Sequence, residues 1–244
     1  RNLKTMKAVI LAAGKGSRIS SIAKNLPKSL LPFKKTTILG HSLEILFKNN
    51  ISEIIVVTGY KNHLLERYVE ENWPGKVNFI FNSLYETTNV LYSFSLSLKF
   101  IENEDILFLH ADTVFENKIL KQLIEITDQK KTVLPIDKHI CGEEEMKVKI
   151  INNKLVEINK TMDASSAHGE FMGLAKISSR HIPLLKKEID EIFKRKQFQA
   201  FFELALENLI KSKSIDISIL DISSCKWCEI DFPDDYKYAL KLFE

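Results

Sequence analysis

No stretch of this sequence is apolar over the roughly 20 residues that a membrane-spanning helix needs. Net charge is also small, because 35 lysines and arginines stand against 32 aspartates and glutamates and leave +3. The basic residues are scattered, whereas nucleic-acid binding typically needs them gathered on one face. The composition therefore predicts no membrane and no nucleic-acid partner, although a local positive cluster would suffice for a small phosphate-bearing molecule.

Cysteine is scarce. The chain has three cysteines, Cys141, Cys225 and Cys228. Their odd number and their lack of the spacing of a disulfide framework predict a reducing, cytoplasmic location. Cys225 and Cys228 form a C-x-x-C pair, but no second pair completes a zinc site, and His139 with Cys141 is a poor substitute. Because redox dithiols sit at helix starts and SCKWCEID has a strand pattern, the favoured interpretation of this pair is structural.

Internal repeats, low-complexity tracts and linker-like stretches are absent as well. Hydrophobic residues make up 45% of the chain and charged residues 27%, which is the composition of a folded globular protein. The length suits a single α/β domain spanning residues 1–244. Residues 1–5, which precede Met6, are either a remnant of cloning or the end of a linker from an upstream domain, and both alternatives stay open.

Strand and helix patterns alternate in the first half of the chain. Residues 7–12, 53–58 and 105–110 are short apolar runs typical of buried strands, and residues 38–49 carry apolar side chains at helical spacing. This alternation predicts a Rossmann-like α/β fold in which helices cover both faces of a mixed, mostly parallel central sheet.

The second half has a different pattern. Asn152 and Asn153 are predicted to form a turn, and Pro233 is predicted to open a final helix, because proline suits the first helical turn. Closely spaced strands, expected to add antiparallel pairings to the first sheet, are predicted at residues 132–136, 147–151, 155–158 and 169–177.

A glycine loop, LAAGKGSR, follows the first strand directly at residues 11–18. Small residues let backbone N–H groups approach phosphate oxygens, and glycine permits the tight turns that this approach needs. Lys15 and Arg18 add positive charge, and Lys28 follows ten residues later, just past Pro27. A strand end, a glycine loop and fixed cations together predict a triphosphate site.

Two better-known phosphate loops do not fit this segment. The dinucleotide pattern G-x-G-x-x-G lacks its third glycine, and Thr58 and Gly59 stand where an acidic residue would hold a ribose. The P-loop pattern G-x-x-x-x-G-K-[ST] is absent from the chain. The remaining alternative is a purely structural turn.

Carboxylates follow two predicted strands. Asp112 comes two residues after the run 105–110, Asp231 follows the strand-like WCEI, and Glu229 shares the face of Asp231. Carboxylates at strand ends are well placed to hold a hard cation beside phosphates, which predicts a Mg²⁺ site formed by these three residues. The alternative for Asp112 is the N-cap of a helix over residues 114–126, and for Asp231 an N-cap before Pro233.

Residues 7–28, KAVILAAGKGSRISSIAKNLPK, resemble the signature of the sugar-phosphate nucleotidyltransferases. That signature is an apolar strand, then L-A-A-G-x-G-x-R-L, then P-K ten residues after the arginine. Ser21 and Ala23 depart from it, standing where proline and threonine are usual. ADT at residues 111–113 and WCEID at 227–231 match the two acidic motifs of the family.

Two further segments narrow the resemblance. TNVLYSFSL and GEFMGLAK, which begin at Thr88 and Gly169, resemble runs found in phosphocholine-type cytidylyltransferases, and the signature is most similar to that of phosphocholine and 2-aminoethylphosphonate cytidylyltransferases. The resemblance covers nearly the whole chain. It implies a GT-A-type version of the Rossmann-like sheet and a partner enzyme, either separate or fused upstream.

The resemblance implies a role for each part of the site. Arg18, Lys28 and Lys160 are the expected catalytic cations, with Lys160 on the acceptor phosphate, although a lysine at a sheet edge is more often only solvated. Expected along the nucleotide and its phosphates are Leu11, Ala12, Ala13, Gly14, Lys15, Gly16 and Ser17, and beside the base edge Asn82, Thr88 and Asn89.

An acceptor with an ammonium group needs an aromatic face or a carboxylate nearby. Most aromatic side chains of the chain are also explained as simple core. The expected acceptor contacts are Tyr92, Glu170, Phe171, Phe201 and Trp227, with Glu203 as an alternative source of charge.

The resemblance therefore predicts a Mg²⁺-dependent cytidylyltransferase. It would transfer CMP from CTP to a small phosphorylated or phosphonylated acceptor of the phosphocholine or 2-aminoethylphosphonate type and release pyrophosphate. The alternatives are a sugar-1-phosphate nucleotidyltransferase that uses UTP, dTTP or GTP, and a non-catalytic homologue that binds nucleotide.

Overall fold

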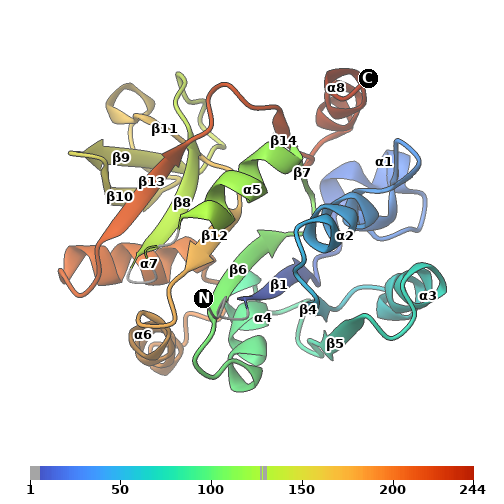
Figure 1. Cartoon of the computed structure of the whole chain (residues 1–244), viewed down its shortest axis with the longest axis horizontal. Helices are drawn as coiled ribbons and strands as arrows, with labels where there is room; N and C mark the ends of the chain where they lie inside the picture. The colour runs from blue at the N-terminus through green and yellow to red at the C-terminus, as the bar shows by residue number, and fades with distance from the viewer. Residues whose placement is uncertain (1–5, 127, 129–130) are drawn as a thin grey trace.

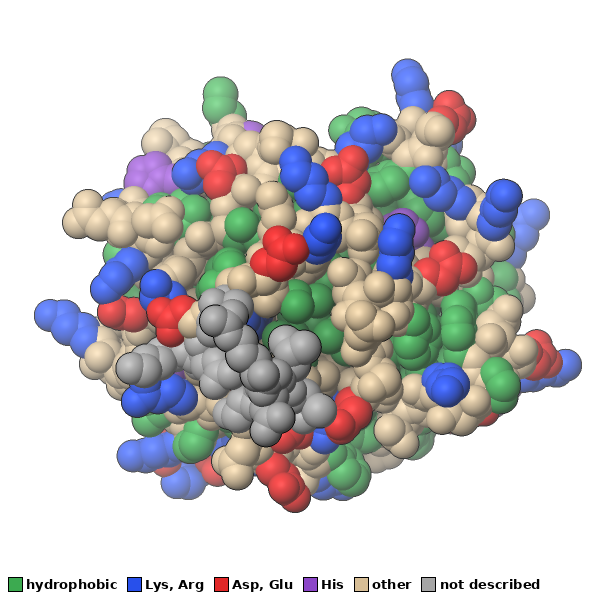
Figure 2. Space-filling model, viewed as in Figure 1, with side chains coloured by type: hydrophobic (Ala, Val, Ile, Leu, Met, Phe, Trp, Pro, Cys, Tyr) green, Lys and Arg blue, Asp and Glu red, His purple; other side chains and the backbone are tan. Residues whose placement is uncertain are grey.

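The computed structural model describes residues 6–126, 128 and 131–244 (Figure 1). The interpretation of residues 1–5 falls outside this range. Lysine and arginine side chains are interspersed with acidic ones over the face shown in Figure 2, in line with the scattered basic residues of the sequence. Within the described residues, every helix is too short or too polar to cross a membrane.

One sheet runs through the molecule, and its order among the described residues is β11-β9-β10-β13-β8-β12-β6-β1-β4-β5. One half holds four parallel strands, which are β6 (Asp105–His110), β1 (Met6–Ala12), β4 (Glu53–Thr58) and β5 (Val77–Phe81). The other half holds β8 (Thr132–Asp137), β9 (Lys147–Ile151), β10 (Lys154–Asn159), β11 (Gly169–Phe171), β12 (Leu174–Ile177) and β13 (Ile217–Asp221).

The second half is mainly antiparallel. Strand β12 joins it to the first half by pairing antiparallel with β6, whereas β13 pairs parallel with β8. The expected mixed Rossmann-like α/β sheet is confirmed. The expectation that it is mostly parallel is corrected, because antiparallel pairings outnumber parallel ones among the described strands, and the parallel pairings are concentrated in the first half. The predicted turn is confirmed too, because Asn152 and Asn153 have φ angles of 50° and 62°.

Helices cover both faces of the sheet because the strands are apolar on both sides. Val9 and Leu11 of β1 pack with one set of helices, and the alternate residues Ala8 and Ile10 pack with the other. The first set is α4 (Val90–Ser97), α6 (Ile182–Lys194) and α7 (Phe202–Lys211), and the second is α2 (Ile38–Lys48), α3 (Asn62–Asn72) and α5 (Asn117–Glu125).

A small outlying layer closes one end of the sheet. Strands β7 (Thr113–Phe115) and β14 (Trp227–Glu229) pair there as a two-stranded sheet. A separate apolar cluster includes Val114 and Cys228 and packs against the final helix α8 (Pro233–Leu242) and the short helix α1 (Ser20–Ala23) (Figure 1). The remaining pair is β2 (Pro32–Phe33) with β3 (Thr36–Thr37).

Two predicted elements are corrected. The single strand expected at residues 169–177 is two strands, because Gly173 takes a φ of +80° that breaks the extended chain. The helix expected at 114–126 starts later, since residues 113–115 pair with β14 and α5 begins at Asn117. Asp112 and Asp231 are therefore not N-caps, the capping residues being Glu116 for α5 and Phe232 for α8.

An aromatic stack joins β6 to the helices beneath it. Phe108 lies 4.0 Å from Phe202 between ring centroids at 16°, and it meets Phe94 edge-on at 5.4 Å. We expect Phe108→Ala to lower the free energy of unfolding by about 3–5 kcal/mol, because it leaves a cavity in a fully buried site. Urea denaturation measures this loss. Phe100→Ala is the matched control, since Phe100 is 49% exposed, and an equal loss in both variants would contradict the stack's role.

Candidate active site

A cavity of about 460 Å³ opens at the carboxyl ends of β1 and β6. This is the edge at which open α/β sheets bind ligands. Most of the predicted site residues line it, namely Leu11, Ala13, Gly14, Gly16, Ser17, Arg18, Lys28, Thr88, Asn89, Asp112, Lys160, Phe171, Phe201, Glu229 and Asp231.

The glycine loop forms one wall of the cavity. Gly16 has a φ of +62°, and a Cβ on it would lie 2.9 Å from Cβ of Lys28, so glycine is needed for both conformation and space. Among the described residues, none accepts a hydrogen bond from the backbone N–H groups of residues 14–16. These donors are therefore free for an anionic ligand.

The two predicted metal aspartates meet because of the small outlying sheet. Glu229 of β14 pairs with Thr113 of β7, and the N–H of Ile230 donates to the carbonyl of Asp112 at 3.0 Å. Asp112 directly precedes β7 and Asp231 comes two residues after β14, so this pairing brings both residues to the same end of the small sheet. Side chains distant in sequence are placed together by backbone pairing.

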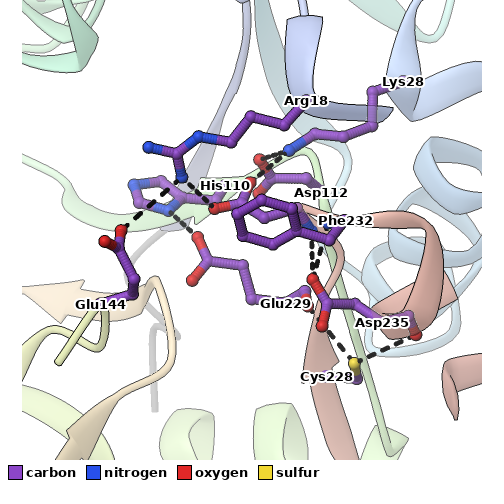
Figure 3. A network of polar contacts seen from close by, with 10 residues as sticks. Arg18, Lys28, His110, Asp112, Glu144, Cys228, Glu229, Phe232 and Asp235 are labelled. Atoms are coloured by element: carbon purple, nitrogen blue, oxygen red, sulfur yellow. Dashed lines mark hydrogen bonds and ion pairs between the residues drawn. The ribbon is translucent and has the colours of Figure 1, made fainter. Parts of the chain in front are cut away.

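The ammonium of Lys28 lies between these two carboxylates, and Figure 3 shows it beside Asp112. Its Nζ is 2.8 Å from Oδ2 of Asp112 and 2.7 Å from Oδ1 of Asp231. Burial alone would lower the pKa of Lys28, but attraction to both carboxylates outweighs it and raises the pKa above its ordinary value. Arg18 joins the group more loosely, with Nη1 3.5 Å from Oδ2 of Asp231.

Asp112 retains an unused oxygen. Burial acts to raise the pKa of its carboxyl, but Lys28 and His110 outweigh burial and lower it, so the group is ionised. Its Oδ1 is buried and has no hydrogen-bond partner among the described residues. One atom of each of His110, Asp112 and Glu229 lies within 4.8 Å of the others. An ionised, unsatisfied carboxylate oxygen beside further carboxylates fits a hard divalent cation such as Mg²⁺.

His110 is a site residue that the sequence analysis missed. It ends β6, lines the cavity, and holds Nδ1 3.8 Å from Oε1 of Glu229. Burial lowers its pKa, but Glu229, Asp112 and Glu203 together outweigh burial and raise the pKa to about 9. Its place at the carboxyl end of β6, two residues before Asp112, was a usable signal.

The far end of the cavity combines aromatic and charged groups. Lys160 places Nζ 5.5 Å from the ring centroid of Phe201, and Phe171 lies nearby in the lining. Glu203 lines the same end and is 3% exposed. Burial raises the pKa of its carboxyl, and His110 offsets this only in part. Met146 and Tyr85 also line the cavity and were not predicted.

Asn82 does not line the cavity and is 1% exposed. Its Nδ2 donates to Thr88 Oγ1 at 3.1 Å and to Ser93 Oγ at 3.0 Å, while its Oδ1 accepts from the N–H of Leu84. The expectation that Asn82 reads a base edge is therefore corrected. It holds Thr88 in the cavity wall instead.

The other predicted site residues that do not line the cavity have side chains with contacts elsewhere or on the other side of the sheet. Tyr92 packs against Phe193 and Phe198, away from the cavity, and Trp227 donates from Nε1 to Asp137 Oδ2 at 2.9 Å. Glu170 precedes Phe171 on a strand and so faces the other side of the sheet. Ala12, which is buried, and Lys15, which is exposed and lies 6.0 Å from the Tyr60 ring, also fall outside the lining.

Comparison with known proteins finds relatives of this chain. The family described as nucleotidyl transferase matches residues 7–141. The chain is 27% identical to CTP:phosphoglutamine cytidylyltransferase of Campylobacter jejuni subsp. jejuni serotype O:2, over 97% of this chain and 100% of that protein. It is 24% identical to CMP-5'-(3-aminopropyl)phosphonate synthase of Streptomyces rubellomurinus, over 96% of this chain but 38% of that protein.

A solved structure has the same fold. CTP:phosphocholine cytidylyltransferase from Streptococcus pneumoniae superposes with a TM-score of 0.82 at 22% identity, over 98% of this chain and 100% of that one. This similarity extends over both halves of the sheet. The GT-A-type, single-domain α/β fold that the sequence predicted is thereby confirmed.

Stability should depend on pH through His110. Its pKa is about 9 in the folded protein against 6.5 for an ordinary histidine, so its stabilising contribution is complete below about pH 6.5 and is lost as pH rises through about 9. Urea unfolding of the metal-free protein should show the free energy of unfolding falling across this window. In His110→Gln, the free energy of unfolding should fall less steeply with pH across this window. If it falls as steeply as in the unsubstituted protein, the imidazole of His110 is neutral at pH 7.

Proposed function

The chain belongs to the nucleotidyl transferase family, and from this premise we propose that it transfers CMP from CTP to a small phosphorylated or phosphonylated acceptor and releases pyrophosphate. The observation that carries the proposal is the placement of Lys28 between Asp112 and Asp231, beside a glycine loop with free N–H groups. Such a cluster suits a reaction in which phosphate charge is bound and redistributed.

The choice of CTP rests on the relatives. The relative from Campylobacter jejuni is matched over its whole length and is named as a CTP-dependent cytidylyltransferase, and the Streptomyces protein is named as the synthase of a CMP-phosphonate. The cavity supports a small acceptor, because about 460 Å³ must hold both substrates.

The chemistry proposed is in-line displacement at the α-phosphorus of the nucleotide. An oxygen of the acceptor phosphate or phosphonate forms the new P–O bond, and pyrophosphate leaves with the electron pair of the broken bond. The acceptor oxygen is already ionised at neutral pH, so no general base is needed. Catalysis then rests on positioning and on neutralising charge.

Each predicted catalytic cation has a place in this scheme. The N–H groups of residues 14–16 and Arg18 bind the triphosphate, while Lys160 at the far end binds the acceptor phosphate. Lys28 keeps its proton because of its raised pKa, and it therefore offers a permanent positive charge to the phosphates. Glu203 gives the acceptor end an acidic group that suits an ammonium or another hydrogen-bond donor.

A divalent cation completes the proposal. Mg²⁺ held by Asp112 and Asp231, with Glu229 alongside, would neutralise charge on the α-phosphate and the acceptor. Lys28 occupies the space between the two aspartates in the structure described here, so its ammonium must share these carboxylates with the metal.

Removing the Lys28 charge should stop turnover without unfolding the protein. We expect Lys28→Met to lower kcat by about 100- to 1,000-fold, because a preorganised charge at the reacting phosphates is lost. A pyrophosphate-release assay measures the change, and far-UV circular dichroism checks the fold. Lys35→Met is the control, because Lys35 is exposed and lies outside the cavity. Near-normal kcat in Lys28→Met would remove Lys28 from the catalytic group.

The substrate assignment is tested by a grid of pyrophosphate-release assays with Mg²⁺. Its rows are CTP, UTP, GTP, ATP and dTTP, and its columns are phosphocholine, phosphoethanolamine, 2-aminoethylphosphonate and glucose-1-phosphate. We expect turnover with CTP and an amine-bearing acceptor. Turnover with a sugar phosphate alone would favour a sugar-1-phosphate nucleotidyltransferase. Absence of pyrophosphate release with every pair of substrates would favour a non-catalytic nucleotide-binding protein.

A further inference from the structure

A second group of side chains that could ligate a metal lies outside the lining of the cavity. It belongs to the connection that follows β8, the strand with which β11 pairs (Figure 1). His139, Cys141 and Glu145 come from the connection between β8 and β9, and one ligand atom of each lies within 4.8 Å of the others. Cys141 is 6% exposed. A nitrogen, a sulfur and a carboxylate oxygen converge here on one small volume.

The imidazole of His139 is oriented by its neighbours. Its Nδ1 lies 3.5 Å from Oδ2 of Asp137, an oxygen that also accepts the Trp227 Nε1–H at 2.9 Å. Its Nε2 faces the opposite way, 3.3 Å from Oε2 of Glu145 and 3.6 Å from Oε2 of Glu170. Metal-binding histidines typically show this arrangement, with a carboxylate on one ring nitrogen and the metal on the other.

Acidic side chains crowd this group. Burial, together with Glu145, Glu229 and Asp137, raises the pKa of Glu170 to about 8. Lys160 offsets this rise only in part, and the Nζ of Lys147 donates to the backbone carbonyls of residues 143, 145 and 160 rather than to these carboxylates. A bound cation would relieve the repulsion.

Cys141 shows the same electrostatic surroundings. Burial, assisted by Glu145 and Glu170, raises the pKa of its thiol to about 11. The thiol is therefore protonated at neutral pH until a metal displaces its proton. Its Sγ–H donates to the carbonyl of His139 at 3.7 Å.

We propose that His139, Cys141 and Glu145 bind a divalent cation of the zinc class, with Glu170 as the fourth ligand. A thiolate, an imidazole and carboxylates are ligands that Zn²⁺ accepts in tetrahedral sites, whereas Mg²⁺ and Ca²⁺ prefer oxygen alone. On binding, the S–H bond of Cys141 breaks, the sulfur lone pair enters the new metal–sulfur bond, and the proton passes to solvent.

The site has a structural consequence for the neighbouring cavity. Met146 follows Glu145 directly, Phe171 follows Glu170, and both line the acceptor end of the cavity. A metal that joins Glu145 to Glu170 therefore fastens two pieces of the cavity wall together. The inference goes beyond nucleotidyl transfer and does not depend on it, since metal binding is measured without substrates.

The test is to load the whole protein, freed of metal by a chelator, with Co²⁺ and to record its absorption spectrum. We expect a thiolate-to-cobalt charge-transfer band, visible bands of tetrahedral intensity, and release of a proton. Zn²⁺ should abolish the band, whereas excess Mg²⁺ should leave it unchanged. The band should vanish in Cys141→Ser. In Asp137→Asn, which removes the carboxylate that orients His139, the apparent affinity for Co²⁺ should fall at least tenfold.

Cys225→Ser is the matched control, because Cys225 belongs to the separate C-x-x-C pair and should leave the band intact. Where Cys141→Ser fails the circular dichroism check for folding, His139→Gln replaces it, and the band should be lost there too. Absence of a charge-transfer band in the natural sequence would overturn the proposal. A band that survives in Cys141→Ser or His139→Gln but disappears in Cys225→Ser would also overturn it.

Discussion

The ammonium of Lys28 between Asp112 and Asp231 is the interaction on which the site depends. Three segments far apart in sequence meet at this single atom, which the pairing of β7 with β14 and the close approach of Gly16 to Lys28 make possible. Without Lys28, two buried or half-buried carboxylates would repel one another. The same charge holds the site together and remains available for phosphate.

Each half of the sheet supplies one wall of the cavity. The parallel half ends in the glycine loop and in His110 and Asp112, which form the end suited to nucleotide phosphates. The antiparallel half supplies the other wall, with Lys160 and Phe171. Because the two halves join through β12 and β6, the cavity lies along the junction. The proposed reaction needs two substrates side by side, and we propose that each half of the sheet binds one of them.

The errors of the sequence analysis share a physical cause. Tyr92, Trp227 and Glu170 were chosen for their chemistry, but chemistry does not say which face of an element a side chain occupies. Phe171 and its neighbour Glu170 alternate across a strand, so only one of them faces the cavity. Asn82 was placed at the correct strand end, yet its amide is used up by local hydrogen bonds.

Short patterns along the chain are enough to predict the alternating elements, the glycine loop, and the cations and carboxylates of the site. The folded chain was needed to find that Lys28 bridges Asp112 and Asp231, that His110 joins them, and that His139, Cys141 and Glu145 converge elsewhere. Contacts between such distant segments depend on strand register and on helix packing, which no local pattern records.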